Sequence, residues 1–131
     1  MLVARLEGVT AIGGIGATNL AARWLGEAHA LLGDPAHARA DYERALAWAT
    51  TVHHRPEIAL TRLGLAELLL EEAVSHQQSA VSSARGEGKL MADQLRAEGS
   101  AHLDFAIAEL RAMNMQPALE RALRHKGLLH A

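Results

Sequence analysis

The sequence predicts an all-α protein with about two helix-turn-helix repeats followed by a terminal helix. Two amphipathic stretches, with apolar residues three and four positions apart, meet at Gly33-Asp34-Pro35, which is typical of a turn between helices. The pattern starts again at Leu60. Alanine and leucine supply 27 and 21 of the 131 residues, a composition suited to closely packed helices, and this length predicts one domain with a modest core.

The first predicted helix ends before Gly33 and is apolar on two sides. Gly26 removes a side chain where another backbone can approach, which would offset its helix cost of ~1 kcal/mol. Gly33 suits the left-handed conformation, Asp34 can cap the next helix, and Pro35 fits that helix's first turn. The apolar sides carry Leu20, Trp24 and Leu31 on one and Leu25, His29 and Leu32 on the other.

The second predicted helix begins at Pro35 and ends near His53. Its expected buried face follows steps of three and four residues through Ala38, Tyr42, Ala45, Ala49 and Val52. Its expected exposed side carries Arg39, Asp41, Glu43 and Arg44.

These two helices resemble the tetratricopeptide repeat family. The resemblance consists of Leu25-Gly26, Gly33-Asp34, Ala38, Tyr42 and Ala45. Leu63-Gly64 echoes Leu25-Gly26 after 38 residues, against ~34 in a standard repeat. The resemblance implies a tetratricopeptide-like right-handed helical-hairpin array, an α-α superhelix. In it, Ala101, Phe105 and Ala108 would repeat the spacing of Ala38, Tyr42 and Ala45.

Residues 1–17 combine apolar residues with several glycines, so we expect a short helical turn and a glycine-rich loop there. We expect the apolar residues of this segment to pack against a preceding repeat. The segment itself would be a remnant of that repeat. The glycines do not match a Walker phosphate-binding loop, because Gly13 is followed by Gly14-Ile15 and not by lysine. Residues 18–131 are predicted to form the tetratricopeptide-like domain.

We predict an insertion in this domain at about residues 74–99. It follows the most apolar predicted helix, which begins at Pro56. Its residues are mostly polar, and Gly86-Glu87-Gly88 interrupts the helical pattern. Either the flanking helices extend into a hairpin with its tip at these glycines, or the segment is a mobile loop. Val74 and Val81, one heptad apart, favour the hairpin.

Two further helices are predicted after the insertion. The first has an apolar stripe formed by Leu103, Ile107 and Leu110, with Phe105, Ala108 and Ala112 beside it. The second starts at Pro117, with Leu119, Ala122 and Leu123 facing inward and a mostly basic exposed face of Glu120, Arg121, Arg124, His125 and Lys126. This last helix would close the array.

Four stretches resemble the C-terminal end of bacterial multidomain signalling ATPases: residues 55–63, 67–70, 102–109 and 115–123. Those proteins typically join a nucleotide cyclase or a LuxR-type helix-turn-helix regulator domain to an ATPase and a tetratricopeptide-like tail. The resemblance implies a regulatory tail. It carries over no catalytic residue, because the family's active sites lie in its other domains.

The sequence does not indicate a catalytic or metal site. The eight histidines lack the two-histidine helical motif with a nearby acid that marks zinc hydrolases, so we expect them to be solvated or loosely packed. Glu71 and Glu72 are adjacent on a helix and point in different directions. We expect no enzymatic activity and no cofactor, and the hypothesis of a metal or ligand binder rests only on the number of histidines.

Charge and composition limit the environment and the partners. A net charge of -2 gives no electrostatic footprint for nucleic acid, and the absence of cysteine excludes disulfides. Arg5 and Glu7 interrupt any signal-peptide core, and no apolar run approaches the ~20 residues of a membrane span. We expect a cytoplasmic protein with a protein partner, or with upstream domains of the same polypeptide.

Four residues are the candidates for partner binding. In tetratricopeptide arrays the first helix of each pair lines the concave groove, and the resemblance therefore assigns Arg23, Glu27, Thr61 and Leu65 to it. The expected function is a non-catalytic protein-interaction or regulatory module. The alternative is the C-terminal tail of a larger ATPase, nucleotide cyclase or transcriptional regulator, whose activity it controls.

Overall fold

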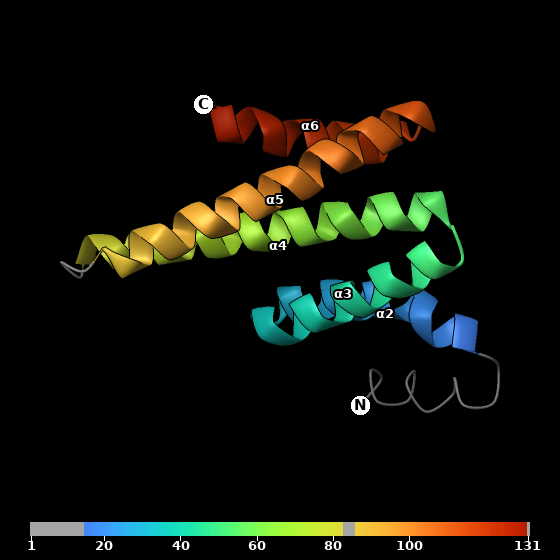
Figure 1. Cartoon of the computed structure of the whole chain (residues 1–131), viewed down its shortest axis with the longest axis horizontal. Coiled ribbons are helices and arrows are strands. Elements are labelled where there is room, and N and C mark those ends of the chain that lie inside the picture. The colour runs from blue at the N-terminus through green and yellow to red at the C-terminus, as the bar shows by residue number, and fades with distance from the viewer. Residues whose placement is uncertain (1–14, 83–85, 131) are drawn as a thin grey trace.

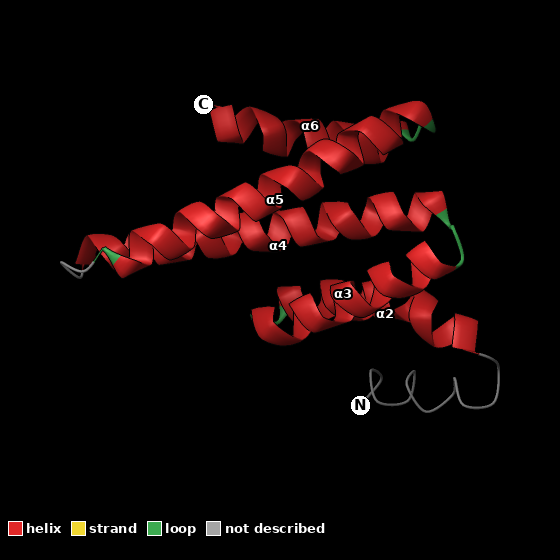
Figure 2. Cartoon of the chain, viewed as in Figure 1, coloured by secondary structure: helices red, strands yellow, loops and turns green. Residues whose placement is uncertain are grey.

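The computed structural model of the chain describes residues 15–82 and 86–130, and all regular structure in these ranges is helical. The all-α prediction is thereby confirmed for this part of the chain (Figure 1, Figure 2). The helices of the described ranges are α2 (Ile15–Leu31), α3 (Pro35–Thr51), α4 (Arg55–Ser82), α5 (Glu87–Ala112) and α6 (Gln116–His130). The predicted turn and loop at residues 1–17 fall outside the described residues, except for the first turn of α2.

Each helix packs against the one that follows it in the chain. Helices α2, α4 and α6 run in one direction and α3 and α5 in the other, so that α2–α3 and α4–α5 form two hairpins (Figure 1). The α4–α5 hairpin is the longer one and extends beyond both its neighbours (Figure 1). None of the helices in the described ranges combines the length and apolarity needed to cross a bilayer.

The turn between α2 and α3 follows the predicted chemistry. Gly33 has a φ of +77°, the left-handed region that glycine enters without a side-chain clash. The Asp34 side chain accepts a hydrogen bond from the backbone N–H of His37, and Pro35 is the first residue of α3. Helix α3 ends at Thr51, two residues before the predicted end.

Tyr42 is clamped between the backbones of α2 and α4. A Cβ atom added to Gly26 would lie 2.9 Å from the Tyr42 ring, and one added to Gly64 would lie 2.7 Å from it. The ring is only 3% exposed. Something does approach Gly26 closely, but it is the Tyr42 ring and not the backbone that was predicted. The two Leu-Gly pairs have one physical role: they leave room for one aromatic side chain.

The second hairpin and α6 enclose a larger apolar cluster. It joins Leu63 on α4 to Leu103 and Leu110 on α5, all completely buried, and to Leu119 on α6. Ala122 of α6 is also buried, as predicted, whereas Leu123 is 40% exposed. A smaller cluster of Leu69, Ala73 and Leu95 continues the contact between α4 and α5 toward the tip of the hairpin.

Residues 74–99 extend the two helices of this hairpin. Helix α4 continues to Ser82 and α5 starts at Glu87, which agrees with the hairpin interpretation and not with the loop. Of the predicted tip, Gly86 precedes α5, whereas Glu87 and Gly88 belong to its first turn.

Helix α5 buries Leu103 and Leu110 of the predicted apolar stripe, and not the residues that the repeat spacing implied. Ala101 and Ala108 are exposed and Phe105 is 38% exposed, so these residues do not repeat the burial of Ala38, Tyr42 and Ala45. The buried residues of α5 are instead Ala92, Leu95, Gly99, Leu103, Ala106 and Leu110. Of the two apolar stripes on this helix, the one with Leu103 and Leu110 therefore forms the core.

Candidate functional site

A cleft of about 390 Å³ opens between α2, α4 and α6, and we call it the α2–α4 cleft. Its walls combine apolar atoms with carboxylates and one guanidinium. A side pocket of about 250 Å³ shares Ala30, Leu68 and Glu71 with it and continues past the end of α2 to Pro35 and Ser75. The cleft is lined by Glu27, Ala30, Leu31, Tyr42, Gly64, Glu67, Leu68, Glu71 and Arg121.

Tyr42 contributes a neutral phenol to the cleft. Burial raises the pKa of Tyr42 to about 12, and the nearby carboxylates of Glu27 and Glu67 act in the same direction. The phenol therefore stays protonated at neutral pH and can offer a hydrogen bond but no negative charge.

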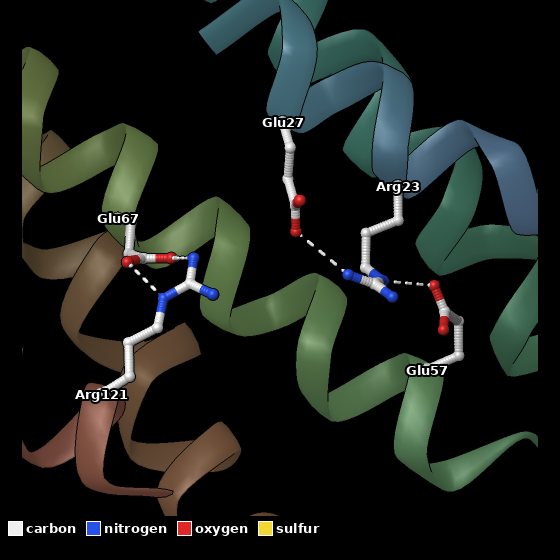
Figure 3. A network of polar contacts seen from close by, with 5 residues as sticks. All are labelled: Arg23, Glu27, Glu57, Glu67 and Arg121. Carbon is white, nitrogen blue, oxygen red and sulfur yellow. Dashed lines mark hydrogen bonds and ion pairs between the residues drawn. The ribbon is translucent and has the colours of Figure 1, made fainter. Parts of the chain in front are cut away.

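An ion-pair network between α4 and α6 forms part of the cleft lining. Arg121 of α6 binds the carboxylate of Glu67 on α4 through two nitrogens, and its Nε donates to Oε2 at 2.8 Å (Figure 3). Nε2 of His125 lies 2.7 Å from the same Oε2. The hydrogen bond with Glu67 raises the pKa of Arg121, so the guanidinium stays charged. Glu67 is thus neutralised within the chain, and α6 is held against α4.

Arg23 holds α2 against the start of α4. Its Nε donates to Oε1 of Glu57 at 2.6 Å and its Nη1 donates to Oε1 of Glu27 at 3.0 Å (Figure 3). The side chains of Arg23 and Glu57 are 11% and 7% exposed, so this pair is largely removed from water. The guanidinium also lies over the Trp24 ring, 4.4 Å from its centre.

We expect the Arg23→Gln substitution to lower the free energy of unfolding by about 2 kcal/mol, because it leaves the Glu57 carboxylate buried without its charged partner. Urea denaturation followed by circular dichroism measures this change. Arg39→Gln is the control, because Arg39 forms exposed ion pairs with Glu43 and Glu98 and its loss should cost less than about 1 kcal/mol. Equal losses in the two variants would contradict a structural role for Arg23.

Two carboxylates at the cleft have no partner within the described residues. Glu71 borders both the cleft and the side pocket, and Glu72 borders the side pocket. In the parts of the chain that the structure describes, neither forms an ion pair, whereas Glu67 pairs with Arg121 and Glu27 pairs with Arg23. The cleft therefore carries uncompensated negative charge at its α4 side.

The structure separates the four predicted partner-binding residues into two pairs. Glu27 lines the cleft, and Arg23 lies beside it with its guanidinium engaged by two carboxylates. Thr61 is completely buried and Leu65 is 2% exposed. These two side chains lie in the interior and not at the surface, which corrects their predicted place on the groove. Partner contact through Arg23 and Glu27 stays a prediction.

The sequence interpretation missed the main residues of the cleft. Glu67 and Glu71 follow Gly64 by three and seven positions, the spacing of one helix face, so the position of Gly64 was a usable signal for them. Arg121 had no local signal, since it is 54 residues from its partner Glu67.

Four histidines, His29, His37, His102 and His125, each lie within hydrogen-bond distance of a charged side chain. Nδ1 of His29 lies 2.6 Å from Oδ2 of Asp41, a residue that is 9% exposed although it was predicted on the exposed side of α3. Burial, and then the charge of Arg62, lower the pKa of His102, whose Nδ1 lies 3.4 Å from the Arg62 guanidinium. Within residues 15–82 and 86–130, no group of three histidine or carboxylate side chains is arranged to hold a metal ion.

Comparison with known proteins adds no assignment to this site. No protein-family model matches the chain, and no significant match was found among curated proteins or solved structures.

Proposed function

We propose that this chain is a non-catalytic protein-interaction or regulatory module with a tetratricopeptide-like helical array. The observation that carries the proposal is the α2–α4 cleft, an open surface between successive hairpins that combines apolar atoms, a phenol and unpaired carboxylates. The Leu-Gly pairs around Tyr42 and the common direction of α2, α4 and α6 (Figure 1) support the array. An array of this kind presents the first helix of each pair to a partner.

The chemistry of the cleft supports binding more than catalysis. The Tyr42 phenol, with a pKa of about 12, is a poor base at neutral pH, and the Glu67 carboxylate is held by Arg121 and His125. Such groups can recognise a partner through hydrogen bonds and charge. We therefore propose no catalytic residue and no cofactor for this chain.

A photo-crosslinking experiment tests the proposal. Leu31, a cleft residue that is 90% exposed, is replaced by p-benzoylphenylalanine, and the chain is irradiated in cells of its source. Ala101, exposed on α5 away from the cleft, carries the same probe in the control. We expect a discrete crosslinked protein with the Leu31 probe and none with the Ala101 probe. The same product from both positions, or none from Leu31, would contradict the proposal.

A second candidate is a regulatory tail of a larger ATPase, nucleotide cyclase or transcriptional regulator in the cytoplasm. Trp24, 60% exposed on the first described helix, favours it, because an exposed indole on α2 offers a docking surface for a domain upstream. An immunoblot of source cells with an antibody against residues 101–125 distinguishes the candidates. A band near 14.0 kDa supports a free-standing module, and a much larger band supports the tail.

A further inference from the structure

We propose that the α2–α4 cleft and its side pocket bind a cationic amphipathic segment of a partner protein, with lysine or arginine side chains pairing with Glu71 and Glu72. This inference rests on the proposed function, because it names the chemistry of the partner. It follows from the shape, the charge and the apolar border of the two hollows.

The two hollows form one continuous surface along α4. They share Ala30, Leu68 and Glu71, and together they reach from Gly64 to Ser75. At 1.5 Å per residue this stretch of α4 is roughly 16 Å long, which corresponds to about three turns of a bound helix. The surface therefore has room for a short segment of a protein rather than for one side chain.

The charges of the surface determine which sign of charge a partner must carry. Glu27 shares the guanidinium of Arg23 with Glu57, and Arg121 pairs with Glu67. Glu71 and Glu72 remain, and an apolar or acidic partner would desolvate these carboxylates without compensation. The C-terminal end of α2, at Ala30 and Leu31, adds the partial negative charge of the helix dipole. A cationic side chain of the partner would interact favourably with both carboxylates and with this helix end.

The border of the surface requires an apolar face on the same segment. Leu31 lines the cleft and is 90% exposed, and the adjacent Leu32 is 78% exposed. Two exposed leucines at a helix end lie next to unpaired carboxylates. They match a partner helix that has apolar residues on one face and basic residues beside them. Nucleic acid is disfavoured, because the cleft has no uncompensated positive charge to meet its phosphates.

The test uses designed peptides with the full chain. The probe is a fluorescein-labelled 18-residue helical peptide with leucines on one face and lysines on the other. The control peptide has the same sequence with glutamate in place of each lysine. Fluorescence anisotropy at low and at physiological salt measures the affinity. We expect the lysine peptide to bind, more weakly as salt rises, and the glutamate peptide not to bind.

Charge reversal locates the binding. The double substitution Glu71→Lys with Glu72→Lys should weaken lysine-peptide binding at least tenfold. The control Glu87→Lys with Glu120→Lys changes the net charge equally at exposed positions outside the cleft and should change binding less than twofold. Circular dichroism confirms that both variants keep the helical fold.

The other outcomes overturn the inference in distinguishable ways. Equal losses in both double variants would show attraction to net charge and not to the cleft. Binding of the glutamate peptide, or of neither peptide, would exclude a cationic partner. In each of these cases a partner crosslinked through Leu31 would leave the proposed function standing, and the absence of that crosslink would remove both.

Discussion

The Tyr42→Ala variant is expected to lose about 3–5 kcal/mol of unfolding free energy, the range found when a buried aromatic side chain is truncated. Tyr42 is 3% exposed and fills the space that Gly26 on α2 and Gly64 on α4 leave open. Both glycines lack a side chain that could move into the cavity. The neighbouring backbones therefore cannot compensate for the missing ring, and the contact of α2 with α4 should weaken.

Thermal and urea unfolding by circular dichroism measures this loss. Tyr42→Phe is the matched control, because it keeps the ring and should change stability by less than about 1.5 kcal/mol. A second check is Gly64→Ala, whose new Cβ would lie 2.7 Å from the ring. Alanine forms helices better than glycine by ~1 kcal/mol, so a net destabilisation there would show that the clash exceeds this gain. A loss below about 1 kcal/mol for Tyr42→Ala would contradict the clamp.

The sequence was most informative where a few neighbouring residues determine the structure. Gly33, Asp34 and Pro35 each favour one position of a helix end, and the turn forms as predicted. Gly26 was also a reliable signal, because a glycine inside a helix is unfavourable unless something packs against it. These features need no knowledge of distant segments.

Contacts between distant segments could not be predicted in the same way. The ion pair of Arg121 with Glu67 and that of Arg23 with Glu57 depend on how α6 and α2 meet α4. Thr61 was assigned to the groove because it lies on the first helix of a hairpin. Its burial instead follows from the rotation of α4 about its axis, which packing against α3 and α5 decides.

Helix α5 shows why the rotation of a helix is hard to predict from its apolar pattern. Leu103 and Leu110 form one stripe and Phe105 with Ala108 another, and both have helical spacing. Gly99 distinguishes them, because a Cβ there would lie 3.1 Å from Leu70, so this glycine marks the face closest to α4. Steps of four, three and four residues from Gly99 reach Leu103, Ala106 and Leu110.

Leu103→Ala is therefore expected to cost about 2–5 kcal/mol of unfolding free energy, and Phe105→Ala only about 1 kcal/mol, although phenylalanine is the larger residue. Leu103 is completely buried in the cluster with Leu63 and Leu110. Phe105 is 38% exposed and contacts the Arg62 guanidinium, 4.1 Å from its ring centre. Urea denaturation of the two variants measures both values under the same conditions.

The variant that loses more unfolding free energy shows which stripe of α5 forms the core. A larger loss for Leu103→Ala supports the face marked by Gly99. A larger loss for Phe105→Ala would instead restore the correspondence of Phe105 with Tyr42 and would require α5 to rotate about its axis. Glycine at a close helix contact would then be a weaker guide to helix orientation than the spacing of aromatic residues, and the same reasoning at Gly64 would have to be revised.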